Sequence, residues 1–335
     1  MRDIFWILFL PLSWLWAAIY GLRRNLHSPK RSHQAPVPII CVGNIHSGGS
    51  GKTPLVVEIA RHFALLKPGI MSRGYRGQLS NVGARVDRNS PRGAALYGDE
   101  PWMLSQMVDA PIFIGRDRAN LIPLIKAEPH CAMVIMDDGF QHFSLRRDVD
   151  LVAISTLRSC NDSFCLPAGD LREPLSAIRF ASAVVLTHDG PYRELWEHYL
   201  REGFPNIPLF HAIKKNLGIW ANGAPARDAS EIRYGAFCGL ADPTGFSRDV
   251  ARLPNAVFLK TFPDHHLYTE KDLTELVASK DNLGIDFLLT TEKDWAKVRE
   301  PFARRKLPSR VMRIGYELPA DFWIFIKMKL DNRRT

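Results

Sequence analysis

The sequence predicts an α/β fold: a mostly parallel sheet with helices on both faces, a second and smaller α/β domain, and an apolar N-terminal helix. Three observations predict it. Short apolar runs alternate with helix-like stretches along the whole chain, which is typical of parallel sheets. A glycine-rich turn joins an early apolar run to a helix, and residues 4–22 are almost entirely apolar.

The composition fits a folded, basic protein. The 335 residues are 46% hydrophobic and 24% charged, enough for one large or two modest domains. The net charge of +9 suits a phospholipid surface, a phosphorylated substrate or nucleic acid, although a merely basic enzyme has the same composition. The five cysteines include no Cys-x-x-Cys pair, so we expect reduced, mostly buried thiols and no zinc site.

The first element is the apolar stretch Ile4–Leu22. At 19 residues it is barely long enough to cross a bilayer, and its three tryptophans and Tyr20 favour the membrane interface. The basic residues between positions 23 and 31 favour the anionic cytoplasmic leaflet. A cleaved signal peptide and a buried core helix are alternatives, but no small-residue cleavage site is evident. We interpret residues 1–30 as a membrane-associated helix with a basic flank.

The next elements are a strand, Val37–Val42, and a helix, Leu55–Leu66, joined by a phosphate-binding loop. In such a P-loop, backbone N–H groups and the positive end of the helix face the phosphates. Lys52 reaches the β- and γ-phosphates, and the Thr53 hydroxyl can hold Mg²⁺. The usual first glycine is replaced by His46, and a plain βα turn is the alternative. The loop residues are Gly48, Gly49, Ser50, Gly51, Lys52 and Thr53.

Further strands and a helix complete a P-loop NTPase-like core, and one strand ends in two carboxylates. Asp137 and Asp138 follow this apolar run, where a carboxylate can hold Mg²⁺ at the carboxyl edge of the sheet. An Asp-Gly turn is the alternative. The expected strands are Gly69–Ser72, Pro111–Ile114, Ala132–Met136 and Leu151–Ile154, and the helix is Trp102–Met107.

Two other polar groups are candidates for chemistry. Asp99 and Glu100 precede Pro101 at a helix start, where capping of the helix and its dipole explains them on composition alone. Phe262–His266 contains two histidines beside an aspartate, which suggests metal binding or proton transfer. A surface loop in which the aspartate orients one imidazole is the alternative, and no third zinc ligand is visible.

The turn-rich stretch Leu166–Pro174 marks a junction, after which a second alternation of strands begins without a phosphate loop. We therefore assign residues 31–158 to the core, 159–312 to a second α/β domain, and 313–335 to a return strand and a C-terminal helix that packs on the core. We expect no nucleic-acid partner, because RNA-stacking motifs and a basic recognition helix are missing from the sequence, and we infer no obligate protein partner. The later elements expected are Val184–Thr187, Pro208–Ala212, Ala236–Leu240, Val257–Thr261, Phe287–Thr290, Val311–Tyr316 and the helix Asp321–Leu330.

Taken together, the motifs resemble the tetraacyldisaccharide 4′-kinase family, the lipid A 4′-kinases of Gram-negative bacteria. They run in the family's order across nearly the whole chain. The matching stretches are Val42–Pro54, Ser72–Tyr75, Gly98–Pro101, Asp137–His142, Leu166–Pro174, Phe262–His266 and Thr290–Asp294.

The resemblance implies transfer of the γ-phosphoryl group of ATP to the 4′-hydroxyl of an acylated glucosamine disaccharide 1-phosphate. This reaction takes place at the cytoplasmic face of the bacterial inner membrane, with ATP and Mg²⁺ as cofactors. The resemblance also implies a two-stranded linker between the P-loop core and the smaller domain. The alternative is a membrane-tethered NTPase switch or assembly factor, which needs a residue that positions water instead of a base for an acceptor.

The resemblance also assigns roles to residues. Lys52 binds the β- and γ-phosphates, Asp99 takes the proton from the sugar hydroxyl, and His265 pairs with Asp99 and tunes it. The residues that organise Mg²⁺ are Thr53, Glu100 and Asp137, with Asp138 beside them. The residues expected to contact substrate or phosphate are Arg73, Arg118, His142 and Arg172.

Overall fold

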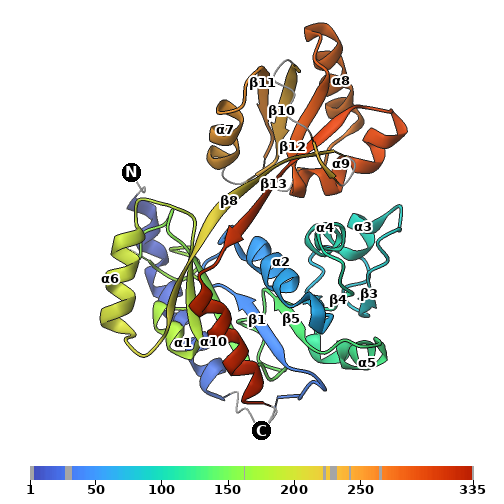
Figure 1. Cartoon of the computed structure of the whole chain (residues 1–335). Helices are drawn as coiled ribbons and strands as arrows, with labels where there is room; N and C mark the ends of the chain where they lie inside the picture. Colours follow the sequence, from blue (N-terminus) through green and yellow to red (C-terminus); the bar gives the residue numbers. More distant parts are fainter. Residues whose placement is uncertain are drawn as a thin grey trace.

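A computed structural model describes residues 4–26, 32–161, 163–221, 224–226, 232–240, 243–263 and 266–333. Two lobes are joined by two long strands (Figure 1). The strands form one path, in the order β11-β10-β12-β13-β8-β7-β6-β1-β5-β2-β4-β3, with β9 (Ala224–Pro225) paired to β8.

The first lobe contains a parallel sheet closed at one edge by the short antiparallel strand β3 (Ala84–Arg85). Its central strand β1 is wholly buried between β5 and β6. These apolar strands alternate with helices along the chain, as the sequence predicts for a parallel sheet. The other strands of this sheet, with their bounds, are β1 (Ile39–Gly43), β2 (Gly69–Ser72), β4 (Ile112–Ile114), β5 (Val134–Asp137), β6 (Val149–Ser155) and β7 (Ala183–Thr187).

Helices cover both faces of this sheet. Alternate side chains of β1 point to opposite faces, so each face presents apolar side chains to a layer of helices. Ile40 and Val42 pack in a core with α2 (Lys52–His62), α4 (Asp99–Met107) and α10 (Ala320–Asp331). On the other face, Ile39 and Cys41 share a core with α5, and α6 covers β6 and β7. The prediction of helices on both faces is confirmed. The remaining helical elements of this lobe are α3 (Gly93–Tyr97), α5 (Ile122–Ala127), α6 (Arg193–Gly203), η3 (Ala64–Leu66), η4 (Arg118–Leu121) and η5 (Leu175–Phe180).

The second lobe is a smaller α/β layer. Its parallel strands β11, β10, β12 and β13 lie in that order. One face packs against α7 and the other against α8 and α9. The elements are β10 (Tyr234–Cys238), α7 (Thr244–Ala251), β11 (Ala256–Thr261), α8 (Glu270–Leu283), β12 (Phe287–Thr291), α9 (Glu292–Arg304) and β13 (Ser309–Glu317).

Strand β8 (Leu209–Ala221) belongs to both lobes. Residues 209–212 pair in parallel with β7, and from Ile213 onward β8 pairs antiparallel with β13. The structure differs here from the expected boundary at residue 159: β7 and the start of β8 extend the first sheet, so the change of lobe lies near residue 213. After β13 the chain returns to the first lobe, where Phe322 and Ile326 of α10 are fully buried.

The N-terminal segment forms η1 (Ile4–Phe9) and α1 (Leu10–Leu26), which lie against the first lobe (Figure 1). Ser13 and Arg24 are buried against it. Within the described residues, no helix has the length and apolar character needed to cross a membrane. The basic positions Lys30 and Arg31 lie outside the described residues. A row of apolar side chains on α1 and η1 is exposed: Leu8, Leu12, Leu15, Ile19, Leu22 and Leu26.

Candidate active site

The phosphate loop lies between β1 and α2, and two of its glycines require left-handed backbone. Gly48 and Gly51 have φ of +89° and +72°, conformations that a side chain disfavours. A Cβ at Gly51 would also overlap the Tyr316 hydroxyl. Lys52 is the first residue of α2, so the N–H groups of this helix end point toward the loop. The loop can therefore bind anionic phosphates.

Asn44 links two parts of the loop through its side chain. Its amide donates to the His46 carbonyl at 2.7 Å and to the Ser50 hydroxyl at 2.9 Å. The Gln141 amide in turn donates to the Asn44 carbonyl at 2.8 Å. His46, which replaces the usual first glycine, is buried and packs edge-on against the Trp196 ring at 5.9 Å. Its imidazole thus anchors the loop in the core of the first lobe.

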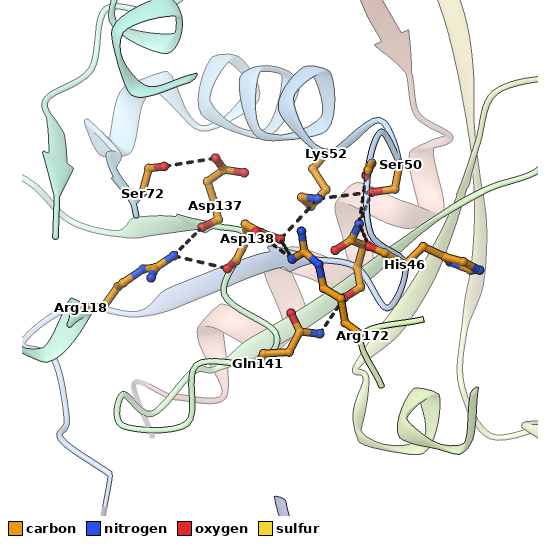
Figure 2. Close-up of polar contacts among 11 residues, drawn as sticks. His46, Ser50, Lys52, Ser72, Arg118, Asp137, Asp138, Gln141 and Arg172 are labelled. Carbon is orange, nitrogen blue, oxygen red and sulfur yellow. Dashed lines mark hydrogen bonds and ion pairs between the residues drawn. The ribbon is translucent and has the colours of Figure 1, made fainter. Parts of the chain in front are cut away.

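Asp138 forms ion pairs with two cationic side chains of the site (Figure 2). Lys52 Nζ lies 3.3 Å from Asp138 Oδ1, and Arg172 Nη1 donates to both carboxylate oxygens at 2.9 Å. Burial opposes ionisation of Asp138, but Lys52 and Arg172 outweigh it and hold its pKa well below its ordinary value. The Lys52 ammonium is therefore held beside the loop by an ionised carboxylate.

Asp137 occupies the carboxyl end of β5 and is almost completely buried. The Ser72 hydroxyl donates to its Oδ2 at 3.4 Å, whereas its buried Oδ1 has no hydrogen-bond partner. Burial raises the pKa of Asp137 to about 7, and the negative charges of Glu100 and Asp138 add to this shift. A buried carboxylate oxygen without a partner fits a cation ligand.

The described side chains do not by themselves form a complete metal-binding site. Across the part of the chain that the structure describes, no group of three or more His, Cys, Asp or Glu side chains has metal-binding geometry. Mg²⁺ is usually bound by one or two carboxylates together with phosphates and water. Asp137 with its unpartnered oxygen, Glu100 beside it in the cavity, and Thr53 on α2 fit that kind of site.

Arg118 and His142 support the end of β5. Arg118 is 4% exposed, and its guanidinium donates to the carbonyls of Asp137 and Asp138 at 3.5 and 3.4 Å. His142 Nε2 accepts from the Arg118 backbone N–H at 3.3 Å. Burial, helped by the Arg118 charge, lowers the pKa of His142 to about 4, so this imidazole is neutral at pH 7. In this geometry Arg118 holds the strand end that carries both aspartates.

Asp99, at the start of α4, is in contact with the second lobe. Lys297 Nζ of α9 lies 3.4 Å from Asp99 Oδ2. Asp264 and the predicted partner His265 lie outside the described residues. The adjacent His266 bonds to Asp272 at 3.0 Å and stacks on Phe262, so it stabilises its own loop.

One cavity of about 1970 Å³ brings these parts together. It extends from α1 past the phosphate loop to the second lobe. Arg73, one of the predicted substrate contacts, also lies on its wall. The lining includes Trp16, Tyr20, Arg23, Gly48, Gly49, Ser50, Gly51, Lys52, Thr53, Arg73, Asp99, Glu100, Arg118, Asp137, Asp138, His142, Arg172 and Lys297.

Comparison with known proteins agrees with this geometry. Residues 5–331 match the LpxK family, described as tetraacyldisaccharide-1-P 4′-kinase. The chain belongs to this family. The tetraacyldisaccharide 4′-kinase of Desulfotalea psychrophila is 33% identical over 336 residues, covering 96% of this chain and 95% of the relative. That of Dechloromonas aromatica is 36% identical over 306 residues, covering 88% and 84%.

A solved member of the family has the same fold. The crystal structure described as the apo form of LpxK from Aquifex aeolicus in complex with ATP has a TM-score of 0.76 and 26% identity, covering 98% of this chain and 99% of that one. The predicted family, the α/β fold and the enzyme class, a kinase, are therefore confirmed.

The sequence did not reveal three residues of the site. Asn44 ties the phosphate loop, Ser72 contacts Asp137, and Lys297 contacts Asp99. Asn44 and Ser72 lie inside or beside recognisable motifs, where a polar residue after a buried strand is a usable signal. Lys297 has no such signal, because it comes from a helix of the other lobe.

Proposed function

We propose that this chain transfers the γ-phosphoryl group of ATP to the 4′-hydroxyl of a tetraacylated glucosamine disaccharide 1-phosphate in lipid A biosynthesis. Membership of the tetraacyldisaccharide 4′-kinase family supports the acceptor. The observation that carries the proposal is a single cavity that contains both Lys52 of the phosphate loop and Asp99 of α4. A phosphate donor and an acceptor hydroxyl can therefore meet there.

The phosphate loop binds and orients the donor. Backbone N–H groups of Gly48–Thr53 and the Lys52 ammonium surround the β- and γ-phosphates, which aligns the phosphorus for in-line attack. Asp137, Glu100 and Thr53 would hold Mg²⁺, with Asp138 beside them; when bound, this ion neutralises charge on the phosphates. Asp138 keeps Lys52 beside the loop.

Asp99 acts as the base on the acceptor. It accepts the proton of the 4′-hydroxyl as the sugar oxygen forms a bond to the γ-phosphorus and the bond to the ADP oxygen breaks. We propose His265 as its partner, in line with the family motif Phe262–His266. Arg73 and Arg172, on the cavity wall, contact substrate phosphates, and His142 offers a neutral imidazole.

We further propose that α1 lies in the interface of the cytoplasmic face of the inner membrane. One face of this helix is docked on the protein through Ser13 and Arg24, and the opposite face exposes a row of leucines and Ile19. Such an amphipathic helix with flanking basic residues binds anionic membranes without crossing them. The cavity reaches Trp16 and Tyr20 of the same helix, so a lipid acceptor can enter from the membrane.

The alternative is an NTPase switch, which would use the same loop and Asp137. Incubating the purified chain with Mg-ATP and the disaccharide 1-phosphate separates the two functions. The kinase yields one phosphorylated lipid for each ADP, whereas a switch yields ADP and inorganic phosphate.

A further inference from the structure

Lys297 is a buried cation that links the two lobes at the proposed base. Its side chain is 5% exposed, and its Nζ lies 3.4 Å from Asp99 Oδ2. The same ammonium donates to the backbone carbonyl of His266 at 3.2 Å. One side chain of α9 therefore contacts α4 of the first lobe and the loop that follows β11.

A buried ammonium needs compensating partners, because it loses its hydration on burial. Lys297 has a carboxylate and a carbonyl from two separate segments. One of these segments carries Asp99. The other carries His266 and, one position earlier in the sequence, His265. Another contact between α9 and α4 is the hydrogen bond of Arg299 with Gln106, which lies on the exposed side of the same helix pair.

We infer that Lys297 is a positioning residue for the phosphoryl transfer. It fixes the Asp99 carboxylate through Oδ2 and holds the backbone at His266 beside it, so that the base is oriented only when the second lobe is docked on α4. The inference rests on the proposed function, since it assigns Lys297 to the orientation of the base in that reaction. A catalytic group displaced by about 1 Å can lose roughly 100-fold in rate.

The test compares Lys297→Met with Arg299→Met. Both variants remove one contact between α9 and α4, but only the first removes a contact with Asp99. We expect Lys297→Met to lower kcat by about 10- to 100-fold while the KM for ATP changes by less than about 2-fold, because the phosphate loop is untouched. Arg299→Met keeps kcat within about 2-fold of the wild type. Equal losses in the two variants would mean that only lobe docking matters, and would overturn the inference.

A double-mutant cycle with Asp99→Ala tests whether Lys297 acts through the base. We expect Lys297→Met to cause no further loss of kcat in the Asp99→Ala background. Additive losses would overturn the inference. Asp99 is 25% exposed to the cavity, so it stays hydrated without Lys297 and the variant should fold. Should Lys297→Met fail to fold, Lys297→Gln, which keeps N–H donors without charge, takes its place in both comparisons.

The two proposals fail in different ways. If the wild-type chain does not phosphorylate the disaccharide, the proposed function is wrong. If the wild type is active and Lys297→Met retains full kcat, only the role of Lys297 is wrong.

Discussion

Trp16, on the N-terminal helix, donates its indole N–H to the backbone carbonyl of Arg172 at 3.0 Å. The guanidinium of the same Arg172 binds both oxygens of Asp138, which in turn contacts Lys52. The next residue, Glu173, is buried and receives two hydrogen bonds of 2.8 Å from Arg24. The apolar helix is therefore docked on the segment that holds the phosphate site.

The Arg24–Glu173 pair should be the main anchor of this helix. We expect Arg24→Met to lower the free energy of unfolding by about 3–5 kcal/mol, because Glu173 would remain as an uncompensated buried charge. Urea denaturation measures the change. Arg23→Met, at the exposed neighbouring position, is the matched control and should change stability by less than about 1 kcal/mol. Equal effects would contradict the assignment of the anchor.

The two loop glycines 51 and 49 should differ in their tolerance of alanine. Gly51→Ala places a Cβ at φ +72° against the Tyr316 hydroxyl, and we expect it to cost about 2 kcal/mol or more of stability. At Gly49 a Cβ meets no atom within 4 Å, so Gly49→Ala should leave the melting temperature unchanged. Thermal unfolding of the nucleotide-free variants checks this, and a stable Gly51→Ala protein would refute the loop geometry.

Asp137 should make the nucleotide-free protein less stable as pH rises. Its pKa is raised from 3.8 to about 7, so the folded state binds the proton more tightly than the unfolded state. This stabilisation is complete below pH 3.8 and is lost as pH rises to about 7, at up to about 1.4 kcal/mol per pH unit. Asp137→Asn mimics the protonated form and should therefore gain stability over the wild type between pH 5 and pH 8.

Urea denaturation of both proteins at the two pH values gives the difference. A difference that is the same at pH 5 and pH 8 would show that Asp137 does not titrate in this range. The substitution should also abolish kinase activity, since it removes the carboxylate proposed to hold the metal ion.

The exposed face of α1 should bind membranes. We expect Leu12→Ser with Leu15→Ser to lower binding to vesicles of phosphatidylethanolamine and phosphatidylglycerol at least about 10-fold, because both side chains are more than half exposed on one face. Sedimentation with vesicles at moderate salt measures this. Leu65→Ser, a 98% exposed leucine outside α1, is the control and should bind as the wild type does. Unchanged binding of the double variant would contradict the interfacial helix.

Local patterns in the sequence predicted most strands of the first lobe and the phosphate loop. β1 and β5 are continuous apolar runs because both faces of the sheet are covered, and such runs are readable without tertiary information. The apolar pattern did not mark the second half of β8 as a strand, and only the family resemblance implied a two-stranded linker there. Residues 213–221 form a linker with little buried surface, and Ile213 is 58% exposed, so no apolar periodicity marks them as strand.

The contacts of the site depended on long-range structure. Arg172 and Asp138 were both recognised from motifs, but their ion pair joins positions 34 residues apart. Lys297 lies 198 residues after Asp99, on a helix whose charge pattern is ordinary for a solvent-exposed face. His46 stands where a phosphate loop usually has its first glycine. Its burial against Trp196 accounts for a histidine at this position.

Transfer of phosphate to a lipid sugar can be measured on the purified chain. The purified chain is incubated with Mg-ATP and tetraacylated disaccharide 1-phosphate in detergent micelles, and the lipid is examined by mass spectrometry and ³¹P NMR. We predict a lipid that carries one additional phosphate, at the 4′ position, with one ADP formed for each product. ADP and free phosphate without a phosphorylated lipid would show that the chain does not transfer phosphate to this acceptor.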